Sequence, residues 1–90
     1  MSKLILYDFW APWCPPCRAF GPKFEAWEEK HGDKADFIKV NIDENAEFAS
    51  KKNISSIPTV ILADEDGNEK ARWVGIPKEA DVLAAIEAAS

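Results

Sequence analysis

Two cysteines, Cys14 and Cys17, are the only ones in this 90-residue chain, and their spacing constrains its fold more than any other feature. They lie in the segment W-C-P-P-C, and the residues that follow have the periodicity of an amphipathic helix. At the start of a helix, two residues at this spacing lie on the same face within bonding distance. A disulfide between them opens and closes with little backbone movement. The pair therefore predicts dithiol–disulfide exchange.

The length and charge of the chain narrow the other possibilities. Ninety residues suffice for one hydrophobic core, so we expect residues 1–90 to form a single soluble domain. We expect a cytoplasmic location, because no secretory signal is visible and no apolar run approaches the roughly 20 residues that cross a bilayer. The net charge of −5 and the absence of a basic cluster disfavour nucleic acid and membranes as partners.

The apolar residues alternate between strand and helix periodicity, which predicts an α/β fold. The first strand is apolar on both faces apart from Asp8, as expected of a strand covered on both sides. The pair Asp66-Gly67 predicts a hairpin turn. The predicted order is βαβαββα, with strand 3–10, helix 15–31, strand 36–42, helix 44–52, strand 59–63, strand 69–74 and helix 78–89.

The position of each cysteine predicts its role. Cys14 lies at the N-terminal end of the predicted helix, where the partial positive charge favours a thiolate. Pro15 and Pro16 have no N–H group, so the Cys17 amide is the chief donor left for the Cys14 sulfur. Cys17 comes one turn later and is expected to be more buried. We therefore expect Cys14 to attack a substrate disulfide and Cys17 to resolve the mixed disulfide.

Other uses of a C-x-x-C pair fit less well. A zinc site usually needs a second pair of ligands, but this chain has no further cysteine and only one histidine, His31. Covalent haem attachment needs a histidine after the second cysteine, where this chain has Arg18. An inert structural disulfide within one helical turn would constrain very little of the chain. We expect no metal site.

Three more residues are candidates for the site. Burial in an apolar strand would raise the pKa of Asp8, which could then exchange a proton with Cys17 through a water. The alternative is a solvated aspartate at the end of a strand. Lys39, on the neighbouring strand, either pairs with Asp8 or reaches solvent. Trp13 lies in a turn beside Cys14, and we expect its side chain to be exposed and to contact a partner.

Taken together, these motifs resemble the thioredoxin family over nearly the whole chain. The resemblance implies a thioredoxin-like, four-stranded mixed sheet flanked by three helices, without the family's usual first strand and helix. The implied strand order is 36–42, 3–10, 59–63, 69–74, with the first pair parallel, the others antiparallel, and 36–42 at an exposed edge. The matching segments are D-F-W-A-x-W-C-x-x-C from Asp8 to Cys17, the helix proline Pro22, I-K-V-N-I-D at 38–43, I-P-T at 57–59, D-x-D-G in the predicted hairpin and W-V-G at 73–75.

The resemblance also implies how the site is built. It implies an exposed Cys14, a shielded Cys17, a cis peptide bond before Pro58 and a proton-relay role for Asp8, with Lys39 beside it in the catalytic group. The backbone of Ile57 would pair with an extended substrate segment. The family's apolar substrate platform would correspond here to Trp13, Ile57, Pro58, Val74, Gly75 and Ile76.

The function that follows is reduction of protein disulfides by a monomer without a bound cofactor. Electrons would come from NADPH through thioredoxin reductase. Pro15 departs from the glycine most often found there in thioredoxins, and residues between the cysteines help set the redox potential. A disulfide oxidase or isomerase of the same fold is therefore the main alternative, and a non-catalytic binding module is another. Glutathione-dependent chemistry is disfavoured, because no clear basic site for the glutathione carboxylates is visible.

Overall fold

A computed structural model describes residues 3–90; Met1 and Ser2, at the start of the predicted domain, lie outside the described residues. The seven predicted elements are present in the predicted order. The bounds of the first helix and the last strand agree with the prediction, and the other bounds differ by one or two residues. The elements are β1 (Leu4–Trp10), α1 (Pro15–His31), β2 (Asp36–Asn41), α2 (Ala46–Lys51), β3 (Thr59–Asp64), β4 (Glu69–Val74) and α3 (Glu79–Ala89).

The four strands form one mixed sheet in the order β2-β1-β3-β4. Strands β1 and β2 are parallel, and the other two pairs are antiparallel. In this register Asp8 lies opposite Lys39 on one side and Val60 on the other. The predicted topology is confirmed, including the position of β2 at an edge.

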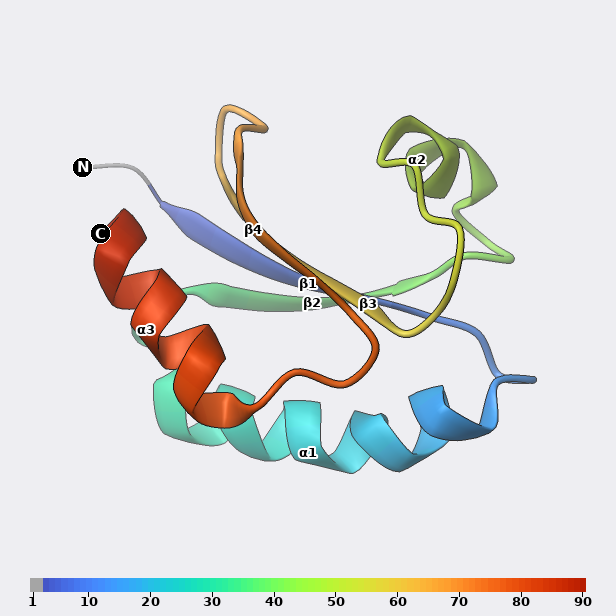
Figure 1. The fold of residues 1–90 in the computed structure, drawn as a ribbon, viewed down its shortest axis with the longest axis horizontal. Helices are drawn as coiled ribbons and strands as arrows, with labels where there is room; N and C mark the ends of the chain where they lie inside the picture. The colour runs from blue at the N-terminus through green and yellow to red at the C-terminus, as the bar shows by residue number, and fades with distance from the viewer. Residues whose placement is uncertain (1–2) are drawn as a thin grey trace.

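Helices cover both faces of the sheet (Figure 1). Helices α1 and α3 lie on one face, and the short helix α2 lies on the other. The larger core lies under α1 and α3, where Leu6, Phe20 and Ile86 are buried together. A smaller core on the α2 side contains Phe9 and Ile61. Because both faces of the sheet are covered there, all six residues of β3 are buried.

Cys14 ends the turn between β1 and α1, and Cys17 lies in the first turn of α1, at the carboxyl end of β1. The end of β2 and the segment leading into β3 converge on the same edge (Figure 1). None of the helices within residues 3–90 is both long and apolar enough to cross a membrane.

Removal of one methylene from the core is expected to destabilise the protein, whereas the same change at the sheet edge is not. Ile86 is 1% exposed beneath α3, and Ile38 is 41% exposed on the edge strand. We expect Ile86→Val to lower the free energy of unfolding by about 0.5–1.5 kcal/mol. Ile38→Val should change it by less than about 0.5 kcal/mol. Urea unfolding of both variants measures the difference, and equal losses would contradict this description of the core.

Candidate active site

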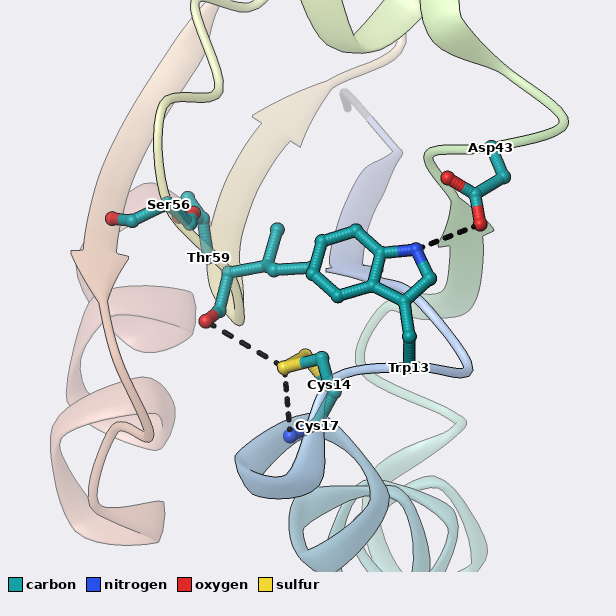
Figure 2. Close-up of a disulfide and its surroundings, with 7 residues drawn as sticks. Trp13, Cys14, Cys17, Asp43, Ser56 and Thr59 are labelled. Atoms are coloured by element: carbon teal, nitrogen blue, oxygen red, sulfur yellow. Dashed lines mark hydrogen bonds between the residues drawn. A yellow bond between two sulfur atoms is a disulfide. The ribbon is translucent and has the colours of Figure 1, made fainter.

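Cys14 and Cys17 form a disulfide at the N-terminus of α1, with their Cα atoms 5.3 Å apart. Cys14 is the N-cap residue of the helix, and Pro15 and Pro16 occupy its first turn. The Cys17 amide donates a hydrogen bond to the Cys14 sulfur over 3.3 Å (Figure 2). The predicted donor is therefore in place, and it favours negative charge on Cys14 when the disulfide is open.

Both cysteines are buried, which contradicts the expected exposure of Cys14. Cys14 is 4% exposed and Cys17 is 2% exposed. The cause is the segment before β3, which brings the carbonyl oxygen of Ile57 to 3.7 Å from the Cys14 sulfur. What distinguishes the two cysteines is the cavity that each one borders. Cys14 borders a cavity of about 480 Å³, and Cys17 borders another of about 230 Å³.

The predicted substrate platform surrounds this disulfide only in part. Trp13 and Ile57 line the same cavity as Cys14. The peptide bond between Ile57 and Pro58 is cis. The carbonyl of Pro58 accepts a 2.8 Å hydrogen bond from the amide of Gly75, whose φ of +95° favours glycine.

The two side chains beside Gly75 differ in where they lie. Val74 is 69% exposed at the end of β4. Ile76 is 44% exposed, and it borders a separate hollow, which Trp27 and Pro77 also line. Ile76 is thus not among the residues that line the cavity next to Cys14.

Asp8 is a buried residue of β1, a strand in the interior of the sheet. Its side chain is 1% exposed, and neither carboxylate oxygen has a hydrogen-bond partner among residues 3–90. Burial raises the pKa of Asp8 to about 7, against the opposing effect of the positive charge on Lys39. The predicted rise in pKa is confirmed, and a solvated strand-end aspartate is ruled out. Asp8 and Cys17 line the same small cavity.

Lys39 is exposed, as one of the two expectations had it, but its ammonium group forms an ion pair with Glu25 of α1 rather than with Asp8. The same group lies 5.9 Å from the centre of the Trp10 ring. A cluster of three or more His, Cys, Asp or Glu side chains able to hold a metal ion is absent from residues 3–90.

Comparison with known proteins identifies the family. The family model "Thioredoxin" matches residues 1–88. The thioredoxin of Bacillus subtilis is 44% identical over 78 residues, which is 86% of this chain and 74% of that protein. The thioredoxin of Alicyclobacillus acidocaldarius is 46% identical over 91% of this chain and 84% of its own length. The crystal structure of Malassezia sympodialis thioredoxin superposes with a TM-score of 0.83 at 36% identity, over 96% of this chain and 76% of that chain.

The chain belongs to the thioredoxin family. Its cysteines have the C-x-x-C spacing and lie at disulfide distance at the start of α1. Family and site together make the protein a dithiol–disulfide oxidoreductase, a disulfide reductase of the thioredoxin type.

One side of this thioredoxin-type site was not predicted from the sequence. The Trp13 indole donates a 2.9 Å hydrogen bond to Asp43, which fixes the ring beside the disulfide (Figure 2). A signal was present, because Asp43 follows the carboxyl end of β2, and carboxyl ends of parallel strands meet at one edge. Five further residues line the cavity beside Cys14, namely Pro15, Ile42, Ile54, Ser55 and Ser56.

The raised pKa of Asp8 predicts a pH-dependent stability. Between the ordinary pKa of 3.8 and the folded value of about 7, the folded protein holds a proton that the unfolded chain releases. Stability should therefore fall as pH rises through this range. Asp8→Asn, which cannot ionise, should be more stable than the unmodified protein by about 2–4 kcal/mol at pH 8. The advantage should shrink as pH falls to 4.

Chemical denaturation of the oxidised protein at a series of pH values measures this difference. Asp33→Asn, at an exposed position, is the matched control and should show no such trend. An advantage of Asp8→Asn that is the same at pH 4 and pH 8 would contradict the assignment.

Proposed function

We propose that the protein reduces disulfides of other proteins, with Cys14 as the attacking and Cys17 as the resolving cysteine. One observation carries the assignment of roles. The Cys14 sulfur accepts a hydrogen bond from the Cys17 amide at the helix N-terminus. Cys14 borders the cavity of about 480 Å³, whereas Cys17 borders the cavity of about 230 Å³ that Asp8 also lines. The sulfur with thiolate stabilisation is thus the one beside the space where a substrate would lie.

The exchange takes two steps. The Cys14 thiolate attacks one sulfur of the substrate disulfide, forms a mixed disulfide and releases the other substrate sulfur as a thiolate. Cys17 then loses its proton and attacks the Cys14 sulfur, which breaks the mixed disulfide and releases the second substrate sulfur. Two electrons pass from the dithiol to the substrate, and the Cys14–Cys17 disulfide is the product on the enzyme.

Asp8 is proposed to accept the proton of Cys17 in the second step. A carboxyl group whose pKa is about 7 exists in both forms at neutral pH, as a general acid–base needs. Both side chains line a cavity of about 230 Å³, which is large enough to hold a water.

The substrate is proposed to bind across the top of the disulfide in an extended conformation. The Ile57 carbonyl lies beside the Cys14 sulfur, where it can pair with the backbone of a substrate strand. The exposed side chains of Trp13, Val74 and Ile76 offer apolar contact area, whereas Pro58 is buried. The proposed contact residues are Trp13, Ile57, Pro58, Val74, Gly75 and Ile76, joined by Ile42 and Ile54.

The remaining parts of the proposal rest on membership in the family. We expect the oxidised protein to be reduced by thioredoxin reductase with electrons from NADPH, and no cofactor to be bound by the chain itself. We further propose that the protein acts as a monomer in the cytoplasm, on protein disulfides and on neither nucleic acid nor membranes.

Substitution of each cysteine tests the assigned roles. Cys17→Ser should accumulate mixed disulfides through Cys14, because the resolving step is lost. Cys14→Ser should abolish turnover and trap nothing, and the double variant is the control for non-specific capture. Non-reducing electrophoresis after incubation with a disulfide-bonded substrate protein measures trapping. Equal trapping by the two single variants would contradict the asymmetry.

The redox potential of the cysteine pair tests the direction of the reaction. Equilibration against a glutathione buffer should give a midpoint near the roughly −270 mV of a thioredoxin. A value near about −120 mV would favour the oxidase alternative instead. A pair with no reversible two-electron couple would favour a binding module.

A further inference from the structure

Two carboxylates are candidates to pair with the ammonium group of Lys39, and only one of them does. Asp8 lies directly opposite Lys39 on the neighbouring strand. Its oxygens nevertheless have no hydrogen-bond partner among the described residues. Lys39 is instead paired with Glu25 on α1. The exposed carboxylate of Glu25 thus pairs with Lys39, the only cation on β2, while the buried carboxylate of Asp8 on β1 has no partner among the described residues.

The small cavity next to the disulfide contains all the groups involved. Asp8, Cys17, Arg18, Glu25 and Lys39 are its titratable or charged lining residues. The remaining lining residues, Trp10, Gly21 and Pro22, carry no charge. On its other side Asp8 faces the uncharged Val60 of β3. The charge balance around Asp8 therefore depends on where the Lys39 side chain lies.

We propose that Glu25 is a positioning residue: by pairing with Lys39 it keeps the ammonium group from forming a direct ion pair with Asp8, so that Asp8 remains able to take up and release a proton. The inference rests on the relay role proposed for Asp8. When Glu25 is neutral, the ammonium group is free to turn toward the unpaired carboxylate. A positive charge within about 4–6 Å lowers the pKa of a carboxyl group by about 1–3 units. Asp8 would then stay ionised at neutral pH and return its proton poorly.

A purely structural role for the ion pair is not expected. Glu25 is 64% exposed and Lys39 is 35% exposed in their side chains. Exposed ion pairs of this kind contribute little to stability, because water and salt screen them. Loss of Glu25 should therefore leave the unfolding free energy nearly unchanged while it shifts the titration of Asp8.

The test is the titration of the Asp8 carboxyl carbon by NMR in the oxidised protein. We expect Glu25→Gln to lower its midpoint by about 1 unit. Glu29→Gln is the matched control, because it removes the same charge one helical turn further along α1, outside the cavity lining. The control should shift the midpoint by no more than about 0.2 units. An unshifted midpoint in Glu25→Gln, or equal shifts in both variants, would overturn the proposal.

A second background separates positioning from direct repulsion between the two carboxylates. Lys39→Met removes the cation and should raise the midpoint of Asp8. In that background Glu25→Gln should lower it by no more than the Glu29→Gln control does. If Glu25→Gln lowers the Asp8 midpoint in the Lys39→Met background as much as it does when Lys39 is present, Glu25 acts directly on Asp8. That result would overturn the positioning role.

The pH profile of disulfide reduction distinguishes this proposal from the relay on which it rests. If the NMR midpoint and the rate profile both move in Glu25→Gln, positioning and relay both stand. If the midpoint moves and the rate profile does not, Glu25 positions Lys39 and the relay role of Asp8 fails. If the midpoint does not move, the positioning role fails whatever the rate profile shows.

Discussion

The pairing of β1 with both of its neighbours is the constraint on which the rest of the structure depends. Because β1 is hydrogen-bonded to β2 and to β3, its residues lie at the centre of the sheet, covered by helices. This register buries Asp8 beneath the start of α1 and directs the next turn, with Cys14, toward the edge where β2 ends. The register that builds the core therefore also builds the redox site.

Burial gives the site its electrostatic character. A carboxylate without a hydrogen-bond partner is costly in an apolar interior, and this cost appears as the raised pKa of Asp8. The Cys14 sulfur has the opposite surroundings, with an amide hydrogen bond at the positive end of a helix. Asp8 in β1 thus disfavours negative charge, whereas Cys14 at the start of α1 favours it. This contrast is what allows neighbouring groups to take different roles at neutral pH.

The accuracy of prediction varied with the range of the interactions involved. The elements, their order and the sheet topology agreed with the sequence prediction, because apolar periodicity, the prolines and the family motifs are all visible in the chain. The burial of Cys14 was not foreseen, since it comes from Ile57, a residue 43 positions away. The bond between Trp13 and Asp43 was missed for the same reason. Lys39 pairs with Glu25 and not with Asp8 because α1 packs beside β2. The spacing of residues along the chain does not predict this packing.

By itself, the sequence determined the chemistry of this protein. Two cysteines at helical spacing before a helix can close a disulfide, because this depends on local chain geometry. A lone aspartate in an apolar strand indicated a raised pKa, but the burial that raises it comes from the packing of helices on the sheet. Only the tertiary structure decided what surrounds these groups. It determined which cavity each sulfur borders, which carboxylate holds the lysine and which loop shields the disulfide. Those choices depend on contacts between segments distant in sequence, which form only when the sheet and its helices pack together.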